Sequence, residues 1–219
     1  MRKIIVSPSI LSADFNCLKE EINKVSKTKA EYLHFDVMDG HFVDNISFGI
    51  PVLKSIAHSH SLVNDVHIMI SEPLHYAKRF VEAGADILTF HYEACKDDKE
   101  VKECIDIIRN SGAKVGLSIK PKTEVEPILK FLKDLDLLLV MSVEPGFGGQ
   151  KFIDNALNKI SKLRKYIDEN NLKTLIEVDG GINEETGKLC VNAGVDILVA
   201  GSYIFGSDDY NKKVDSLLK

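Results

Sequence analysis

The sequence has few of the features that mark secreted, redox-active or zinc-ribbon proteins. Its 219 residues include only four cysteines, which are scattered along the chain and never form a Cys-x-x-Cys pair. This spacing argues against a zinc ribbon, a redox motif and a disulfide framework. We therefore expect Cys17, Cys95, Cys104 and Cys190 to be reduced thiols in a cytoplasmic protein.

Long apolar runs and long basic runs are also missing. The N-terminal run Ile4-Ile5-Val6 is followed by Pro8 and is too short for a signal peptide or a membrane span. The formal net charge is −5, and no stretch of lysine and arginine offers a surface for nucleic acid. The sequence thus predicts no membrane and no nucleic-acid partner, although a small phosphorylated substrate would need only a local positive pocket.

What the chain does contain is a regular alternation of two hydrophobic patterns. Apolar residues make up 44% and charged residues 28%, as in ordinary globular proteins. Short β-branched or leucine-rich runs, typical of strands, alternate with longer amphipathic stretches, typical of helices. We expect strands at residues 4–8, 32–37, 63–70, 86–90, 114–119, 136–141, 174–178 and 196–200. The expected helices between them include residues 15–27, 73–83, 101–111, 156–169 and 184–193.

Eight such strands alternating with eight helical segments, with no break in composition, predict an α/β fold with a single (β/α)8 TIM barrel over residues 1–219. A doubly wound open sheet is the alternative. Residues 81–88 and 191–198 share the pattern Val-x-Ala-Gly-x-Asp-Ile-Leu, half a chain apart. This repeat indicates either two similar half-barrels or a turn sequence that favours this connection, and both interpretations fit a barrel.

Polar side chains occupy strand ends that a barrel would bring together. His34 and Asp36 lie two residues apart on an apolar strand, so their side chains share one face. His67 and Asp179 lie at the ends of two other strands, and in this fold the C-terminal strand ends form the active-site face. Because burying a charge without a partner is costly, we interpret these four residues as ligands of one metal ion.

The expected cofactor is one divalent metal ion per subunit. Imidazole nitrogen and carboxylate oxygen suit Zn²⁺ and Fe²⁺ best, with Co²⁺ and Mn²⁺ as alternatives, whereas the imidazoles disfavour Ca²⁺. His91 also lies at a strand end on this face of the barrel. Asp39 is nearby, but its odd offset from Asp36 turns it away from the ligand face.

Glycine-rich loops follow three of the expected strands. The run Pro-Gly-Phe-Gly-Gly-Gln at residues 145–150 follows the sixth strand, and its glycines allow backbone N–H groups to approach an anion and permit a mobile lid. Gly180-Gly181 follows the seventh strand and Gly201-Ser202 the eighth, which are the loops that recurrently bind phosphate in this fold. We therefore predict a phosphate cradle of backbone N–H groups.

The two aspartates predict a reaction class. Asp36 and Asp179 would approach the barrel axis from different sides, so one could remove a proton beside a metal-polarised carbonyl while the other delivers a proton to the opposite face. Such two-sided exchange is epimerisation. Met38, Met69 and Met141 lie at matching strand ends, where they would pack a water-excluding wall around an enediolate or simply fill the core.

At these motifs the chain resembles the ribulose-phosphate 3-epimerases. The resemblance follows the whole chain in order and is carried by residues 7–15, 34–40, 65–69, 141–150 and 177–182, of which the Pro-Gly-Phe-Gly-Gly-Gln block is highly specific. It implies a TIM barrel of the ribulose-phosphate-binding type. The implied activity is a metal-dependent interconversion of D-ribulose 5-phosphate and D-xylulose 5-phosphate, through a metal-stabilised enediolate, in the pentose phosphate pathway.

The resemblance also assigns roles to individual residues. His34, Asp36, His67 and Asp179 match the metal ligands, with Asp36 as the proton acceptor and Asp179 as the proton donor in one direction. Ser9 and His67 match substrate-contacting positions. The residues that match the substrate- and phosphate-binding loops are Gly146, Phe147, Gly148, Gly149, Asp179, Gly180, Gly181, Gly201 and Ser202. The expected partners are a small sugar phosphate and further copies of the chain in a homo-oligomer.

One position departs from the family pattern, and other activities stay open. Asp44 stands where the family usually has proline before Asn45, so we expect a slightly looser loop and a modest effect on affinity. A 3-epimerase of a related ketose phosphate, such as D-allulose 6-phosphate, is the main alternative, although Gly181 favours the pentose enzyme. A decarboxylase would need a lysine among its carboxylates, for which only Lys120 is a candidate. A non-catalytic phosphate- or metal-binding barrel would be expected to lose one aspartate.

Overall fold

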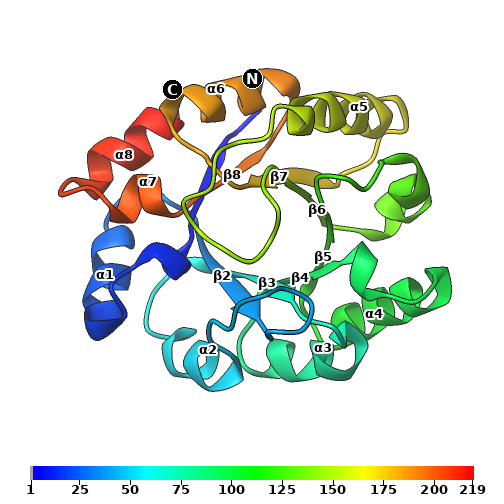
Figure 1. The fold of residues 1–219 in the computed structure, drawn as a ribbon, viewed down its shortest axis with the longest axis horizontal. Coiled ribbons are helices and arrows are strands. Elements are labelled where there is room, and N and C mark those ends of the chain that lie inside the picture. Colours follow the sequence, from blue (N-terminus) through cyan, green and yellow to red (C-terminus); the bar gives the residue numbers. More distant parts are fainter. Residues whose placement is uncertain (1) are drawn as a thin grey trace.

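The computed structural model describes residues 2–219, and its centre is a barrel of parallel strands enclosed by helices (Figure 1). The strands are β1 (Ile5–Pro8), β2 (Tyr32–Met38), β3 (Val63–Met69), β4 (Ile87–His91), β5 (Lys114–Ile119), β6 (Leu137–Met141), β7 (Leu175–Asp179) and β8 (Ile197–Ala200). Their order is β1-β8-β7-β6-β5-β4-β3-β2. A bridge between Ser9 and His34 brings β1 and β2 together, so the barrel is nearly closed.

The helices lie outside the strands in chain order. They are α1 (Leu18–Val25), α2 (Ile50–Ile56), α3 (Pro73–Glu82), α4 (Asp98–Asn110), α5 (Asn155–Glu169), α6 (Glu184–Ala193), α7 (Ser202–Phe205) and α8 (Tyr210–Leu217). Short 3-10 helices are η1 (Ile10–Ser12), η2 (Phe15–Cys17), η3 (Tyr92–Ala94) and η4 (Glu126–Asp134). Within residues 2–219, no helix combines the length and the apolar character that crossing a membrane requires.

The predicted barrel is confirmed, and the open-sheet alternative is wrong. Every expected strand is present, with each end within one residue of the expected range. The helical prediction differs in three places. The helix expected over residues 101–111 is α4, which begins at Asp98, three residues earlier, because the Asp97 side chain caps its first turn. The segment expected as one helix over residues 15–27 divides at Cys17, because the Asp14 side chain caps η2 and α1 begins only at Leu18. Between β5 and β6 the connection is the 3-10 helix η4, whose buried Ile128 and Phe131 repeat at the three-residue period of that helix.

Every residue of β2 is buried, because one face of the strand meets the helices and the other faces the barrel interior. Leu33 and Phe35 belong to the large apolar cluster that joins the strands to the helices. Tyr32 belongs to a separate cluster, with residues of β4, β6 and β8, that fills the inside of the barrel. Because alternate side chains share a face, His34 and Asp36 point inward with Tyr32.

The repeated turn sequence has a local structural reason. Asp86 and Asp196 each accept a hydrogen bond from a backbone N–H of the preceding strand, at 2.7 and 2.8 Å. Asp136 makes the same contact at 2.9 Å, although no Ala-Gly pair precedes it. The aspartate therefore ties adjacent strands at the N-terminal end of the barrel. This favours turn chemistry over duplication as the explanation of the repeat.

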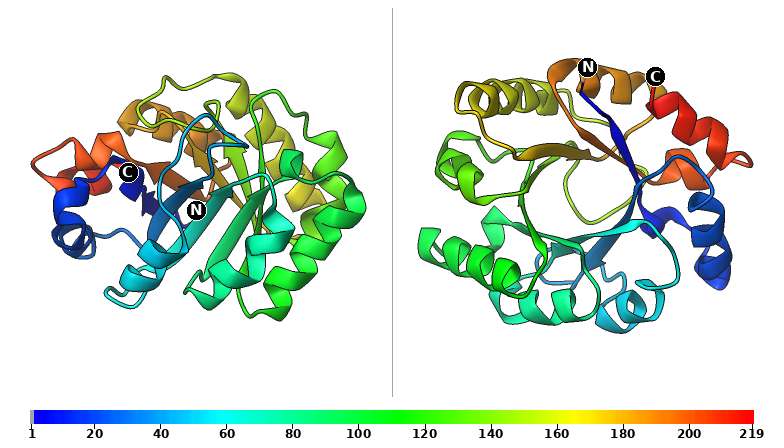
Figure 2. Two further views of the ribbon diagram at one scale, coloured as in Figure 1. Left: turned by 60° about the horizontal axis from the view of Figure 1, so that its bottom comes forward. Right: turned by 180° about the vertical axis from the view of Figure 1, so that it is seen from behind.

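Two long loops cross the C-terminal end of the barrel. In Figure 1 the loop after β6, drawn in yellow-green, passes over the centre of the strands, and the loop after β2 lies across from it. The side view in Figure 2 shows both loops rising above the strand ends, and its rear view shows the opposite end of the barrel. Asn45 Nδ2 donates a hydrogen bond of 2.8 Å to the Gly146 carbonyl, which joins the two loops.

Candidate active site

Three strands bring the predicted metal ligands together at the C-terminal end of the barrel. His34 and Asp36 lie on β2, His67 lies opposite Asp36 on β3, and Asp179 is the last residue of β7. One donor atom from each of these residues lies within 4.8 Å of the others. His34 Nε2 and His67 Nδ1 approach the same oxygen, Asp36 Oδ1, at 3.2 and 3.1 Å. The residues chosen from the sequence therefore form one cluster.

The cluster has the donor set and the electrostatics of a cation site. His34 Nε2 is buried and makes no hydrogen bond to any residue of 2–219. Burial opposes the ionisation of Asp36, but His34 and His67 outweigh it and hold the pKa of this carboxyl below its usual range. Burial would also lower the pKa of His34, yet Asp36 and Asp65 raise it. A pocket that keeps a carboxylate ionised and favours positive charge fits a divalent cation with nitrogen and oxygen ligands.

Asp179 is in the opposite electrostatic state from Asp36. Burial and the negative charge of Asp36 raise the pKa of Asp179 to about 7. Asp36 is further stabilised in its ionised form by Ser9, whose Oγ–H donates to Asp36 Oδ2 at 2.5 Å. Two neighbouring carboxyl groups whose surroundings move their pKa values apart can serve as an acid and a base.

A second group of buried polar residues lies behind His34. Asp65 Oδ2 accepts hydrogen bonds from His34 Nδ1 at 2.7 Å and from Ser7 Oγ at 2.9 Å. Glu177 is fully buried, and burial together with the charge of Asp65 raises its pKa well above the usual value. Asp65 and Glu177 are not among the site residues predicted from the sequence. The signal was available, because each precedes a predicted ligand by two residues on an apolar strand and therefore faces the same way.

A pocket opens between the cluster and the loops that follow β6, β7 and β8. Ser9, Asp36 and Asp179 line it. The glycine-rich residues predicted to hold a phosphate also line it: Gly146, Phe147, Gly148, Gly149, Gly180, Gly181, Gly201 and Ser202. The structure thus places carboxylates and glycine loops around one cavity, while His34 and His67 lie deeper, fully buried.

Close packing explains two of these glycines. Gly180 has φ +121°, and a Cβ there would lie 2.5 Å from Val143 Cγ2. A Cβ on Gly201 would lie 2.6 Å from Ser12 Oγ. The loop after β7 therefore runs so close to its neighbour that only a residue without a side chain fits at Gly180, whereas a side chain at Gly201 would require Ser12 Oγ to move.

The loop after β6 is held in a turn by its own side chain. Gln150 Nε2 donates to the carbonyl oxygens of Glu144 and Phe147, at 2.7 and 2.9 Å. Phe147 is 57% exposed although it lines the pocket, and Gly148 is exposed beside it. An internally braced loop with an exposed aromatic tip has the form of a lid over the cavity.

The three methionines lie where strand ends meet the pocket. Met38 and Met69 are paired neighbours on β2 and β3, and they pack with Val43 in a small apolar cluster. Met141 packs with Val143 in the cluster that fills the barrel. All three methionines are at most 4% exposed, so they form an apolar wall beside the carboxylates.

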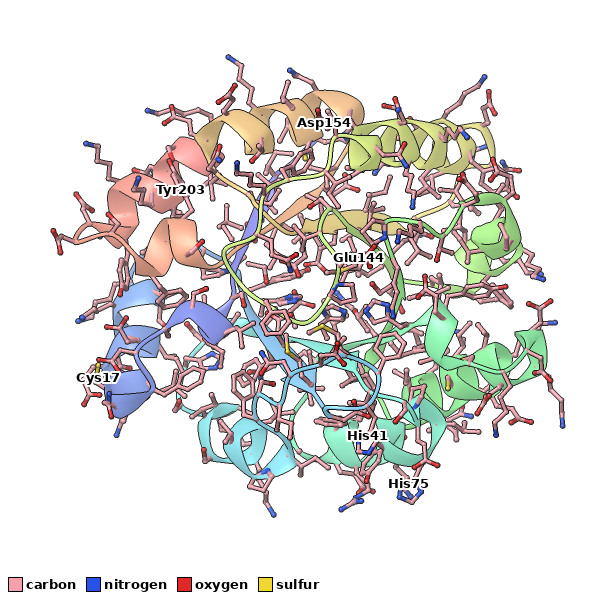
Figure 3. The ribbon with its side chains drawn as sticks, in the orientation of Figure 1. Cys17, His41, His75, Glu144, Asp154 and Tyr203 are labelled. Carbon is pink, nitrogen blue, oxygen red and sulfur yellow. The ribbon has the colours of Figure 1, made fainter. Side chains whose placement is uncertain are left out.

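Other polar residues lie apart from this cluster. The Asp39 carboxylate accepts hydrogen bonds from Ser71 and from backbone N–H groups of its own loop. Lys120 Nζ lies 3.8 Å from the centre of the Phe42 ring, so it does not supply the lysine that a decarboxylase would need among its carboxylates. Figure 3 shows Glu144 over the centre of the barrel, whereas Cys17 and His75 lie at its periphery.

Known proteins resemble this chain along its whole length. A model of the ribulose-phosphate 3 epimerase family matches residues 5–205. The chain is 46% identical over 215 residues to a ribulose-phosphate 3-epimerase of Bacillus subtilis (strain 168), with 98% of each protein covered. It is 48% identical over 205 residues to that of Mycobacterium bovis, which covers 94% of this chain and 87% of the relative.

Solved structures of lower identity share the fold. KGPDC from Streptococcus mutans superposes with a TM-score of 0.70 at 12% identity, covering 99% of this chain and 96% of the other. A tryptophan synthase alpha-subunit from Pyrococcus furiosus gives a TM-score of 0.70 at 15% identity, covering 100% and 99%. These likenesses extend to the TIM barrel alone, because barrels of one architecture host unrelated activities.

Proposed function

The chain belongs to the ribulose-phosphate 3-epimerase family, and from this premise we propose that it interconverts D-ribulose 5-phosphate and D-xylulose 5-phosphate with one divalent metal ion per subunit. The reaction inverts the C3 carbon, so a proton must leave one face of that carbon and return to the other. The observation that carries the proposal is the pair Asp36 and Asp179. They line one pocket from different strands, with pKa values shifted in opposite directions.

Asp36 is the base in one direction of the reaction. It is ionised, and the hydrogen bond from Ser9 fixes its Oδ2 at 2.5 Å. It takes the proton from C3, and the electron pair of the C3–H bond forms a C2–C3 double bond while the carbonyl electrons move to O2. Removal of a proton by a positioned carboxylate accelerates such a step by about 10²- to 10⁴-fold.

Asp179 is the acid in the same direction. Burial and the negative charge of Asp36 raise the pKa of Asp179, which favours the protonated form that an acid needs. It delivers this proton to the opposite face of C3, and the electrons on O2 re-form the carbonyl. The product has the inverted configuration, Asp36 now carries a proton and Asp179 is ionised. This is the starting state of the reverse reaction, so the two residues exchange roles.

The buried cluster would hold the metal. A divalent cation bound by His34, Asp36, His67 and Asp179 would supply positive charge that acidifies the carbon next to the substrate carbonyl. The donor set of two imidazoles and two carboxylates favours Zn²⁺ or Fe²⁺, with Co²⁺ or Mn²⁺ as alternatives. His34 Nε2 and His67 Nδ1 lie 3.2 and 3.1 Å from Asp36 Oδ1, so the donor atoms of these three residues converge on one point.

The other pocket residues would bind and shield the substrate. Backbone N–H groups of the lid (residues 146–149), of Gly180-Gly181 and of Gly201-Ser202 would hold the phosphate. Met38, Met69 and Met141 would exclude water from the carbanion-like intermediate.

A coupled assay on D-ribulose 5-phosphate tests the proposal. The protein is stripped with a chelator, its metal content is measured, and Zn²⁺, Fe²⁺, Co²⁺ and Mn²⁺ are added back in turn. We expect the stripped protein to be inactive and at least one metal to restore turnover. Full activity of metal-free protein would overturn the metal requirement. A higher kcat/KM for D-allulose 6-phosphate, measured side by side, would replace the pentose substrate with the six-carbon one.

Compartment and assembly are part of the same proposal. All of Cys17, Cys95, Cys104 and Cys190 are free thiols, which suits the reducing cytoplasm. We propose that the chain works there, in the pentose phosphate pathway, as a homo-oligomer. Light scattering of the purified protein at several concentrations measures the subunit number, and a monomer at all of them would contradict the oligomer.

A further inference from the structure

His91 and Glu93 form a chain of contacts behind His67, and the mechanism above does not use them. His91 is the last residue of β4 and is fully buried, and the Glu93 side chain in η3 is 20% exposed. His67 Nε2 lies 2.9 Å from His91 Nε2. His91 Nδ1 lies 3.2 Å from Glu93 Oε2. Since His67 Nδ1 faces Asp36 at 3.1 Å, two imidazoles span the gap between two carboxylates.

This arrangement is one hydrogen atom short. Two neutral imidazoles carry one N–H each, but the chain Asp36–His67–His91–Glu93 has three gaps to fill. A carboxylate can only accept, so each end of the chain requires either an N–H or a cation beside it. The two nitrogens 2.9 Å apart in the middle gap also need a hydrogen between them, because two lone pairs would otherwise face each other. One N–H therefore fills the middle gap and the other fills one end, and the remaining end is left for a positive ion.

Glu93 determines which gap is left. Its Oε1 accepts hydrogen bonds from the Lys120 backbone N–H, at 2.7 Å, and from the Thr123 hydroxyl. These donors hold the carboxylate with Oε2 toward His91, so His91 Nδ1 must carry its hydrogen there. His91 Nε2 is then an acceptor, and it requires the N–H of His67 on Nε2. The lone pair of His67 Nδ1 is left facing Asp36 and the metal cluster.

We propose that His91 and Glu93 are positioning residues that hold His67 in the tautomer whose Nδ1 is free to bind the metal ion. The proposal rests on the proposed function, because it assumes that His67 is a metal ligand. His34 has a shorter arrangement of the same kind, in which the Asp65 carboxylate contacts Nδ1 directly and leaves Nε2 toward Asp36. Groups that orient a ligand histidine in this way are worth about 10- to 100-fold in metal affinity.

The substitution Glu93→Gln is a sharp test because it reverses the direction of the hydrogen bonds from residue 93 to His67 while the side chain keeps its shape. The donors from Lys120 and Thr123 retain the amide oxygen at the Oε1 position. The amide NH₂ then occupies the Oε2 position and donates to His91 Nδ1. His91 must carry its hydrogen on Nε2, where it opposes the N–H that metal-bound His67 needs. Thr123→Val is the matched control, since it removes a hydrogen bond to Glu93 but leaves the carboxylate as an acceptor.

Two measurements on the full chain decide the matter: Zn²⁺ affinity by competition with a chromophoric chelator, and ¹⁵N NMR of the histidine rings in Zn²⁺-loaded protein. We expect wild-type His91 to carry its hydrogen on Nδ1, Glu93→Gln to weaken Zn²⁺ binding about 10- to 100-fold, and Thr123→Val to bind nearly as wild type. Equal Zn²⁺ affinity of Glu93→Gln and wild type would overturn the proposed positioning role of His91 and Glu93. A wild-type His91 with its hydrogen on Nε2 would overturn it as well.

A second substitution protects the test against a folding defect. Should Glu93→Gln fail to give a native circular dichroism spectrum, His91→Leu removes the acceptor for His67 Nε2–H and is expected to weaken Zn²⁺ binding as well. Unchanged Zn²⁺ affinity in His91→Leu would also overturn the proposed positioning role. If the wild-type protein itself fails to bind stoichiometric Zn²⁺, Fe²⁺, Co²⁺ or Mn²⁺, the proposed function fails first, which distinguishes the two.

Discussion

Asp36 and Asp179 have the same side chain but different surroundings, and the proposed roles depend on that difference. We expect Asp36→Asn and Asp179→Asn each to lower kcat by about 10²- to 10⁴-fold, because an amide neither removes nor delivers the proton. The coupled assay measures this loss. Solvent deuterium exchange at C3 can survive one substitution if the remaining aspartate still acts alone. Asp106→Asn, an exposed position on α4, is the control and should leave kcat unchanged.

Turnover within a few-fold of wild type in either variant would refute the two-base scheme. Metal content has to be measured in both, because each residue also belongs to the donor cluster. A variant that binds metal normally and still fails to turn over isolates the proton-transfer role. A variant that has lost the metal is informative about the cluster only.

Asp39 shows how one carboxylate fixes a loop. It accepts hydrogen bonds of 2.8 Å from the backbone N–H groups of His41, Phe42 and Ser71, and one of 2.7 Å from Ser71 Oγ. Burial would raise its pKa, but these hydrogen bonds outweigh burial and lower the pKa to about 2. The ionised form is thus stabilised in the folded state. The hydrogen bonds between Asp39 and Ser71 also hold the loop after β2 against the end of β3.

We expect Asp39→Asn to destabilise the fold by about 1–3 kcal/mol at pH 6, since the amide NH₂ would face N–H donors. An aspartate of an unfolded chain has a pKa of about 3.9. The stabilisation is therefore present above pH 3.9 and is lost as the pH falls through about 2. Urea unfolding at pH 6 and pH 3 should show a smaller difference between variant and wild type at the lower pH. A difference that is equal or larger at pH 3 would contradict this assignment.

The sequence predicted some of these residues and missed others for a physical reason. His34 and Asp36 were found because a pair of polar residues two apart on an apolar strand has to share a buried face. Asp65 and Glu177 obey the same spacing, since each lies two residues before a ligand, so the pattern places them on the buried face but does not say what they contact. Their purpose depends on contacts between β2, β3 and β7, and a one-dimensional pattern does not contain those contacts. The direction of the His91 contacts likewise depends on Glu93 and a distant loop.

The glycine loops have two different requirements, one for motion and one for close packing. A Cβ on Gly148 would lie at an ordinary 3.5 Å from Ser12 Oγ, so alanine fits there. A Cβ on Gly180 would lie 2.5 Å from Val143 Cγ2, and its φ of +121° is strained for alanine. Two substitutions of the same chemistry should therefore act on different properties of the protein.

We expect Gly148→Ala to raise KM about two- to fivefold with little change in stability, because alanine restricts the lid by about 0.5–1 kcal/mol. We expect Gly180→Ala to destabilise the fold by more than about 1–2 kcal/mol, the usual penalty of a left-handed alanine. Steady-state kinetics and thermal unfolding of both variants separate the two effects. An unchanged KM for Gly148→Ala would count against the lid, and a Tm for Gly180→Ala equal to that of wild type would count against the packing argument.

Strands were predicted more closely than helices, and the reason lies in burial. Each strand of the barrel is covered on both faces, so its apolar run begins and ends where the strand does. Helices have one exposed face, and their limits depend on caps such as Asp14, which starts η2 three residues before α1. The hydrophobic pattern also could not predict that η4 is a 3-10 helix, because its apolar positions fit an α-helix equally well.

The barrel as a whole explains why residues so distant in sequence form one site. Parallel strands present all of their C-terminal ends at one end of the molecule, so side chains from β1, β2, β3, β4 and β7 meet there. The cluster of His34, Asp36, His67 and Asp179 draws on strands more than a hundred residues apart. A cation bound among them joins β2, β3 and β7, and these strands separate only when the barrel unfolds.

Metal binding should therefore stabilise the whole fold. A ligand that binds only the folded state at a concentration of 100 Kd adds about 2.7 kcal/mol. For a chain of this size each kcal/mol raises Tm by about 2–4 °C. We expect Zn²⁺ at that excess to raise the Tm of chelator-treated protein by about 5–11 °C, as measured by differential scanning calorimetry. His34→Gln removes the buried Nε2 atom, which has no hydrogen-bond partner and is available to bind the metal, and should abolish most of this increase in Tm. Asp106→Asn should retain it. An equal shift in His34→Gln would place the stabilising ion elsewhere on the protein.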